Sequence, residues 1–213
     1  MTDTFQIAVI PGDGIGTEVT EATLAVLNAV QRRINGYHLS YTKLMAGAAY
    51  YSDTEKDIEA NAELQAGQAD AIYLGAIGLP TVRASDGTEI APHLRLREQF
   101  ELYAGLRPVR AYKEAPLALS DPRAKALDLI IVRESTEGLF YTAAVHNRSP
   151  KTNADEAHET LRLTRSVTER LCDFAFTVAE RRKARGKKGE VTCVGKANVF
   201  KAFAFFRQIF DER

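Results

Sequence analysis

The chain has little of three things: cysteine, net charge and long apolar segments. Only two of its 213 residues are cysteines, Cys172 and Cys193, and both lie in apolar stretches. So few cysteines argue against a secreted disulfide scaffold and fit a reducing compartment, so we expect a cytoplasmic protein. The 28 basic residues equal the 28 acidic ones. This balance argues against a dedicated nucleic-acid binder, which usually carries a basic excess.

No apolar run approaches the roughly 18 residues that a membrane-spanning helix requires. The first residues, "MTDTFQIAVIPGDG", lack the basic and apolar regions of a signal peptide. We therefore expect neither a signal peptide nor a membrane partner. Hydrophobic residues make up 45% of the chain, which is enough for a core and for one or two domains.

The first half of the chain alternates between strand and helix patterns. Apolar runs at residues 5–10, 37–44 and 70–75 predict strands, and a helical pattern covers residues 18–34. A second helix is expected from Ser52 or Asp53 to Gly67. This alternation predicts an α/β domain with a parallel sheet and right-handed crossovers. The long irregular stretch at residues 75–92 is of a length that is usually functional or disordered.

The pattern changes near residue 105, so we predict a first domain at residues 1–105 and a second at 106–213. The predicted elements around and beyond this boundary are a helix at residues 93–105, an extended segment at 106–112, a buried strand at 127–134, a turn-rich arm at 135–153, a helix at 155–182, a strand at 191–195 and a final helix. The final helix carries five phenylalanines and is apolar on nearly every side. Such a helix is expected to be covered on several faces, in another subunit or by chain beyond this sequence.

The stretch "IAVIPGDGIGTEV" at residues 7–19 raises the question of a dinucleotide-binding turn. The Rossmann fingerprint needs G-x-G-x-x-G. Here Gly12 and Gly14 fit, but Thr17 occupies the third position and Asp13 would place a carboxylate beside any bound phosphate. The alternative is a tight strand-to-helix turn with Thr17 as the N-cap.

Three arginines stand at positions where burial is expected: Arg97 on a helix face, Arg107 before a proline and Arg133 at the end of an apolar strand. A buried guanidinium needs a partner. One interpretation is local pairing, Arg97 with Glu101 and Arg133 with Glu134 or Glu137. The other is a shared pocket in which forked guanidinium groups bind a small polycarboxylate.

Four motifs, "IAVIPGDGIGTEV", "LRLREQFELYAGLRPVR", "IIVRESTEG" and "VGKANVFK", together resemble the β-decarboxylating dehydrogenases, which include isocitrate, 3-isopropylmalate, homoisocitrate and tartrate/malate enzymes. The resemblance covers essentially the whole chain. It implies an isopropylmalate dehydrogenase-like, non-Rossmann α/β fold with a parallel or mixed sheet and a second domain that carries a dimerisation arm at residues 135–153. It also implies a homodimer with shared active sites.

The family oxidises a 2-hydroxy acid that bears a carboxylate on C3, transfers hydride to NAD or NADP, and releases CO2. By this resemblance, Arg97, Arg107 and Arg133 bind the carboxylates of a small 2-hydroxy di- or tricarboxylate. Lys196 assists removal of the hydroxyl proton, in the site of the partner subunit; the alternative is a lysine that faces solvent. The implied cofactor-binding residues are Ala76, Gly78, Glu89 and Asn198.

Two departures from the family pattern affect the chemistry. The family's general acid is a tyrosine seven residues after Arg133, where this chain has Phe140; either the next residue, Tyr141, replaces it or water protonates the enol. The family also uses Mg2+ or Mn2+, bound by aspartates beyond residue 213. We therefore expect no metal ligand within this chain, and we expect the chain to be the N-terminal part of a longer protein.

The sequence allows more than one substrate and two alternative functions. Ala91 and His93 stand where the family lines the pocket for the variable substituent, so a small or polar substituent, as in malate or tartrate, is favoured over isopropylmalate. His93 either contacts that substituent or caps the helix. One rival function is a catalytically silent, structural subunit. The other is nucleic-acid binding through the basic stretch "RRKARGKK" at residues 181–188.

Overall fold

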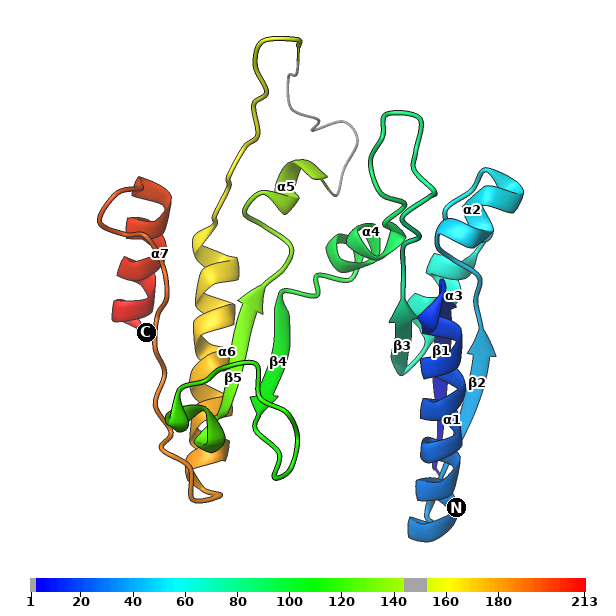
Figure 1. Ribbon diagram of the computed structural model, residues 1–213, viewed down its shortest axis with the longest axis horizontal. Coiled ribbons are helices and arrows are strands. Elements are labelled where there is room, and N and C mark those ends of the chain that lie inside the picture. Colours follow the sequence, from blue (N-terminus) through cyan, green and yellow to red (C-terminus); the bar gives the residue numbers. More distant parts are fainter. Residues whose placement is uncertain (1–2, 144–152) are drawn as a thin grey trace. The chain divides into compact units, whose positions relative to one another are not determined.

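A computed structural model describes residues 3–143 and 153–213. The chain forms two compact units, Met1–Leu96 and Arg97–Arg213. The elements are β1 (Asp3–Gly12), α1 (Ile15–Ile34), β2 (Tyr37–Lys43), α2 (Ala48–Thr54), α3 (Ala62–Gln68), β3 (Ala71–Ala76), α4 (Pro92–Gln99), β4 (Ala104–Arg110), the 3-10 helix η1 (Pro122–Ala126), β5 (Asp128–Glu134), α5 (Phe140–Ala143), α6 (Arg165–Lys183) and α7 (Lys201–Glu212) (Figure 1).

The first unit contains a three-stranded parallel sheet in the order β2-β1-β3. β1 is the central strand, and its segment Ala8, Val9 and Ile10 is at most 2% exposed. This burial on both sides explains the unbroken apolar run at residues 7–10 within β1. The predicted parallel α/β sheet is confirmed for this unit. The arm at residues 135–153 falls partly outside the described residues.

Truncating the centre of β1 tests the importance of this core. Ile10 is 0% exposed, whereas Ile15, in the first turn of α1, is 66% exposed. We expect Ile10→Ala to lower the free energy of unfolding by about 2–5 kcal/mol, because it leaves a cavity in a packed strand. The control Ile15→Ala should change it by less than about 1 kcal/mol. Urea unfolding measures both, and equal effects would contradict the described core.

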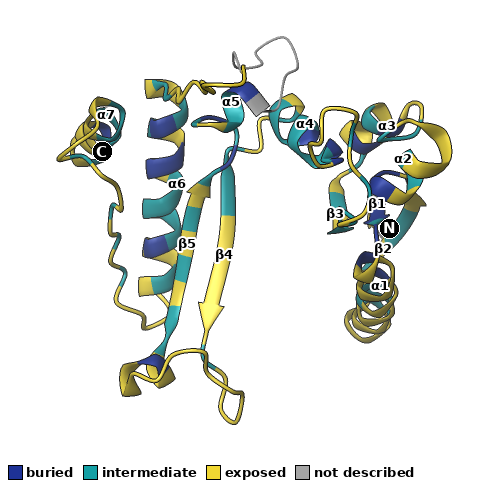
Figure 2. Cartoon of the chain, turned by 45° about the horizontal axis from the view of Figure 1, so that its top comes forward, coloured by how far each residue is buried: buried dark blue, intermediate teal, exposed yellow. Residues whose placement is uncertain are grey.

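The second unit is built on the antiparallel pair β4–β5, with α6 packed against β5 and α7 packed against α6. Successive β5 residues alternate in exposure. Ile130 and Val132 are half-buried, whereas Leu129 and Ile131 are 41% and 50% exposed. The strand predicted at residues 127–134 is confirmed as β5, but the expectation that it is buried was wrong, since its residues are half-buried or exposed. Figure 2 shows most of β4 exposed and buried residues recurring along α6.

The last helix is covered on one side only by the described part of the chain. Ile209 of α7 is 0% exposed, and the Phe210 ring lies 5.5 Å from the ring of Phe176 on α6. At the start of the helix, Val199 and Phe200 remain 59% and 56% exposed. The helix thus buries one face against α6, and the expectation of further covering partners stays a prediction.

Several element boundaries differ from the predictions because residues adopt left-handed backbone conformations. The helix expected up to Gly67 is two short helices, since Glu55 and Asn61 have φ angles of 59° and 64°. Likewise α4 ends at Gln99 rather than near residue 105, and Glu101 has a φ of 47°. Such conformations end a right-handed helix.

Two predictions in the second half of the chain were also wrong. The helix expected from residue 155 begins at Arg165, where the Thr164 hydroxyl accepts a hydrogen bond from the Val167 N–H. The expected strand at residues 191–195 is irregular backbone. The residue pattern of each segment is compatible with the predicted element, so the pattern alone led to the wrong prediction.

The division between the units lies between Leu96 and Arg97, whereas the sequence places the boundary near residue 105. Side-chain contacts join residues 101–103 to the second unit. Arg170 of α6 donates to the Glu101 carboxylate at 3.1 Å, and its guanidinium lies 4.2 Å from the Tyr103 ring centroid. Tyr103 also meets Phe174 edge-to-face. These contacts place the segment that follows α4 against α6.

Candidate carboxylate-binding site

The glycine-rich turn after β1 contains its own anion. Asp13 is 3% exposed, and its carboxylate accepts hydrogen bonds from the backbone N–H groups of Ala48, Ala49 and Gly78, each at 2.8 Å. A phosphate bound at this turn would meet a buried negative charge instead of free N–H donors. The Rossmann interpretation is therefore wrong for this turn, as the departure from the fingerprint indicates.

The glycines of the turn allow two backbone segments to approach closely. A Cβ atom on Gly12 would overlap the carbonyl of Ala76 at the end of β3, and Gly12 has a φ of 75°. A Cβ on Gly16 would overlap backbone atoms of Pro11 and Ala76. The predicted N-cap is wrong: α1 begins at Ile15, with Gly14 rather than Thr17 at the N-cap.

The structure brings the three predicted arginines of the second unit together. Arg97 stands in the last turn of α4, Arg107 on β4 and Arg133 on β5. In the β4–β5 register Arg107 lies opposite Ile131, and Arg133 lies opposite Gly105. Opposite residues of an antiparallel pair share a face, so Arg107 and Arg133 are diagonal neighbours on one face of the hairpin.

Electrostatics show that Arg97 lies close to the other two. Burial lowers the pKa of the Arg97 guanidinium, and the positive charges of Arg133 and Arg107 lower it further. The cluster is less buried than the sequence suggests, because Arg97 is half-buried while Arg107 and Arg133 are exposed. Three guanidinium groups that repel one another form an arrangement that a bound anion would stabilise.

The acidic residues considered as local partners all bind elsewhere. Glu101 accepts from Arg170, and Glu134 accepts from the backbone N–H of Glu137 at 2.7 Å. The Glu137 carboxylate accepts from both the N–H and the hydroxyl of Thr164, each at 2.7 Å. Among residues 3–143 and 153–213, no salt bridge involves any of the three arginines. The local-pairing interpretation is therefore wrong.

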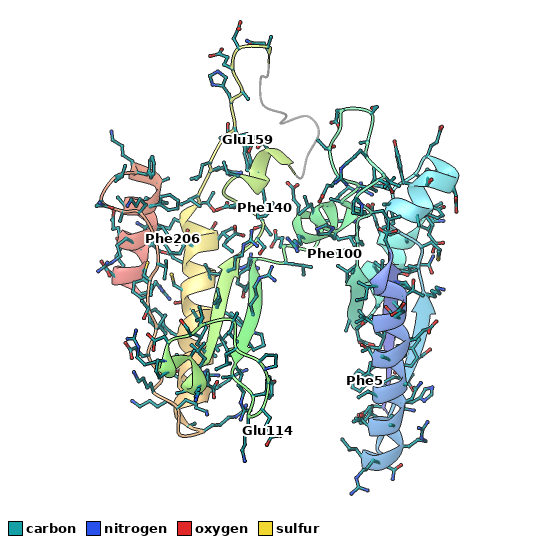
Figure 3. All side chains as sticks on the ribbon, in the orientation of Figure 1. Phe5, Phe100, Glu114, Phe140, Glu159 and Phe206 are labelled. Carbon is teal, nitrogen blue, oxygen red and sulfur yellow. The ribbon has the colours of Figure 1, made fainter. Side chains whose placement is uncertain are left out.

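The residue beside the arginine cluster is Phe140 and not Tyr141. The guanidinium carbon of Arg133 lies 5.2 Å from the centroid of the Phe140 ring, a cation–π contact. The Tyr141 ring instead meets the guanidinium of Arg162 at 4.7 Å. Figure 3 labels Phe140 at the start of α5, directly after the loop that follows β5. An aromatic ring without a hydroxyl thus borders the cluster.

Lys196 and Asn198 lie in the turn that precedes α7, and both are exposed. The Lys196 carbonyl accepts from the N–H groups of Val199 and Phe200, each at 3.1 Å. Figures 1 and 2 place α7 on the side of α6 that is opposite the β4–β5 hairpin. Within the described residues of this one chain, no hydrogen bond joins Lys196 to the arginine cluster.

The other predicted site residues belong to the first unit. The Ala76 carbonyl accepts from the Asp13 N–H at 2.6 Å, and the Gly78 N–H donates to the Asp13 carboxylate. Glu89 forms an ion pair with Arg83 at 3.4 Å, and His93 stands in the first turn of α4. Sequence reasoning missed Asp13 as an anchor. The available signal was an acidic residue between two glycines directly after a buried strand.

The described residues offer no ready site for a hard cation. Among them, no group of three or more histidine, cysteine, aspartate or glutamate side chains could hold a metal ion. In the same part of the chain, no helix is both long and apolar enough to cross a membrane.

Some of the basic side chains at residues 181–188 form ion pairs within the chain. Arg182 donates to the side chain and the carbonyl of Asp128, each at 2.8 Å, and the Lys187 ammonium lies 2.6 Å from the same carboxylate. These contacts fasten the end of α6 to the start of β5. Two of the cations counted toward a nucleic-acid patch therefore have an internal partner.

This ion pair predicts a pH dependence. Hydrogen bonds from Lys187 and then Arg182 lower the pKa of Asp128 from its ordinary 3.8 to about 2. A carboxyl with a lowered folded-state pKa stabilises the fold above its ordinary pKa, and the contribution disappears as the pH falls toward about 2. We expect Asp128→Asn to lower the free energy of unfolding at neutral pH and to have progressively less effect in acid. A difference that stays constant from pH 7 to pH 2 would contradict this assignment.

The described residues thus contain an α/β unit whose glycine turn holds its own carboxylate, and a hairpin with three arginines, on and beside one face, that form no salt bridge within this part of the chain. The sequence matches the isocitrate/isopropylmalate dehydrogenase family over residues 6–213. The chain belongs to this family.

Relatives and solved structures agree. The chain is 34% identical to the 3-isopropylmalate dehydrogenase of Moorella thermoacetica, over 98% of this chain and 57% of that protein. It is 36% identical to the 3-isopropylmalate/3-methylmalate dehydrogenase of Methanocaldococcus jannaschii, over 96% and 55%. The crystal structure of isocitrate dehydrogenase from Methylococcus capsulatus aligns with a TM-score of 0.75 and 27% identity, over 98% of this chain and 56% of that one. The chain thus spans little more than half the length of these proteins.

Proposed function

We propose that the protein catalyses NAD(P)-dependent oxidative decarboxylation of a 2-hydroxy acid that carries a carboxylate on C3. In this proposal the chain supplies the carboxylate-binding part of the active site. The observation that carries the proposal is the convergence of Arg97, Arg107 and Arg133, with every considered acidic partner bound elsewhere. Family membership supports the reaction class.

The arginines would bind the substrate carboxylates and fix the orientation of the carbon that loses hydride. Forked guanidinium groups match the two oxygens of a carboxylate and bind them through charge-assisted hydrogen bonds. A substrate with two or three carboxylates would offset the mutual repulsion within the cluster. Affinity should therefore rise with the number of carboxylates that reach the three side chains.

Lys196 is proposed to assist removal of the hydroxyl proton in the site of a partner subunit. The exposed position of Lys196 in the turn before α7 supports a role toward another copy. A homodimer with shared active sites would supply each arginine cluster with this amine. For general-base work the amine must lose its proton, which burial in the dimer would favour.

The dinucleotide is proposed to bind beside the loop after β3, through Ala76, Gly78 and Glu89, with Asn198 near the nicotinamide. Gly78 has open space beside its Cα, since an added Cβ would meet no atom within 4 Å. When bound, NAD or NADP would accept the hydride. Mg2+ or Mn2+ does not fit the described residues, because the arginine cluster contributes no carboxylate, and no step is derived through a metal.

The preferred substrate is proposed to carry a small or polar substituent. Ala91 and His93 precede Arg97 at the positions expected to meet the variable group, and neither is a bulky aliphatic residue. D-malate, tartrate, isocitrate and isopropylmalate should be compared as substrates of the full protein. We expect the highest kcat/KM with malate or tartrate; uniquely fast turnover of isocitrate, or of isopropylmalate, would overturn this preference.

The alternative is a catalytically silent family member that serves as a structural or regulatory subunit. Phe140 beside Arg133 favours it, because a phenyl ring has no proton to donate. Equilibrium binding of a dicarboxylate with NAD, followed by a turnover assay, separates the two functions. A protein that binds the dicarboxylate and turns it over supports the enzyme; one that binds neither compound supports the silent subunit.

A further inference from the structure

Asp13 joins three segments that are far apart in the sequence. Its own N–H donates to the Ala76 carbonyl at the end of β3, and its carboxylate accepts from the start of α2 and from Gly78. These partners lie 35 and 65 positions along the chain from Asp13. All the segments belong to the first compact unit.

The surroundings of the Asp13 carboxylate are shaped to accommodate it. The Asp13 side chain is 3% exposed, and no cation within the described residues forms a salt bridge with it, so its charge is satisfied by backbone N–H groups. The start of α2 has no side-chain cap of its own. A Cβ on Gly47 would overlap the Asp13 carboxylate. The carboxylate therefore stands in for the missing cap, and Gly47 leaves the space for it.

The hydrogen bond from Gly78 to Asp13 holds the first residues of the loop after β3 in place. Gly78 has a φ of 115° and follows the β3 residue Ala76 by two positions. Its N–H is held by the same oxygen, Oδ2, that binds the Ala48 N–H. One carboxylate oxygen thus connects the loop backbone at Gly78 to the start of α2. Gly78 is also the loop residue beside which an added Cβ would meet no atom within 4 Å.

We infer that Asp13 is a positioning residue for the dinucleotide side of the site, because it holds Gly78 and the loop that follows. This inference rests on the proposed function. In this inference the Asp13 carboxylate acts through the loop backbone, by accepting from the Gly78 N–H. Loss of the carboxylate would remove the acceptor of three N–H groups, of which that of Ala48 is buried and those of Ala49 and Gly78 are partly buried, and would release the loop.

Asp13→Asn in the full protein tests this, with Asp53→Asn on the exposed side of α2 as the matched control. The amide nitrogen of asparagine cannot accept, so at least one N–H loses its partner. We expect faster hydrogen exchange at Ala48, Ala49 and Gly78. We also expect the KM for the dinucleotide to rise about tenfold, with kcat and the KM for the hydroxy acid within about twofold of the parent. Asp53→Asn should change none of these.

Three results would contradict the inference or the proposed function on which it rests. Unchanged exchange and an unchanged dinucleotide KM in a folded Asp13→Asn variant would overturn it. If that variant does not fold, hydrogen exchange of the unmodified protein decides: Gly78 should open together with Ala48, and an unprotected Gly78 amide contradicts the anchor. A parent protein that binds no dinucleotide refutes the proposed function and the dinucleotide role, while the exchange data still report whether Asp13 holds the loop.

Discussion

Arg97→Met is expected to lower the affinity for a 2-hydroxy dicarboxylate about a hundredfold, because a forked guanidinium–carboxylate contact contributes two charge-assisted hydrogen bonds. The same change should leave the free energy of unfolding unchanged or raise it. Arg97 has no salt bridge among the described residues, and its neighbours Arg133 and Arg107 repel its charge. Methionine keeps the apolar stem and removes the repulsion. Calorimetric titration and urea unfolding measure the two quantities.

Arg95→Met is the matched control, two residues earlier on the same helix. Arg95 donates to the Asp57 carboxylate at 2.8 Å and also pairs with Glu63. Its loss should destabilise the fold by about 1 kcal/mol, since these partly exposed ion pairs are individually weak. It should not remove a direct substrate contact. A destabilised Arg97→Met variant with unchanged affinity would assign Arg97 a structural role.

Phe140→Tyr is expected to raise turnover about tenfold or more, because a positioned general acid commonly contributes a factor of about a hundred or more. The family resemblance implies a tyrosine at this position, and the Phe140 ring lies against Arg133. A hydroxyl added there would stand beside the arginine cluster. The rate of enol protonation, followed by exchange of solvent deuterium into the product, measures the change.

Tyr141→Phe provides the comparison. The Tyr141 ring lies against Arg162 and not against Arg133, so its hydroxyl should matter little to protonation. We expect kcat within about threefold of the parent. A loss of a hundredfold would show that Tyr141 supplies the proton, and that the arm moves by one residue in the working enzyme.

The sequence predicted the sheet of the first unit and the arginine cluster because both depend on local patterns. Residues 7–10 of β1 are apolar on both faces, and the arginines occur in motifs whose order and spacing resemble those of the family. Local pairing of the arginines with nearby glutamates was the other interpretation. It failed because Glu101 and Glu137 are bound by groups far along the chain, such as Thr164, 27 residues from Glu137. Glu134 instead accepts hydrogen bonds from the backbone just after it.

Other features could not be predicted because tertiary contacts determine them. The apolar run of β5 indicates burial on both faces, yet α6 covers only one of them. The role of Asp13 depends on N–H groups that lie far along the chain. The expected strand before Lys196 has high β-propensity, but propensity does not decide the outcome without a neighbouring strand to pair with.

The central claim is that Arg97, Arg107 and Arg133 bind one small polycarboxylate. A crystal structure of the full protein with D-malate tests it most directly. The account predicts carboxylate oxygens within hydrogen-bonding distance of all three guanidinium groups. A ligand bound away from them, or guanidinium groups that each pair with a protein carboxylate while the ligand is present, would contradict it.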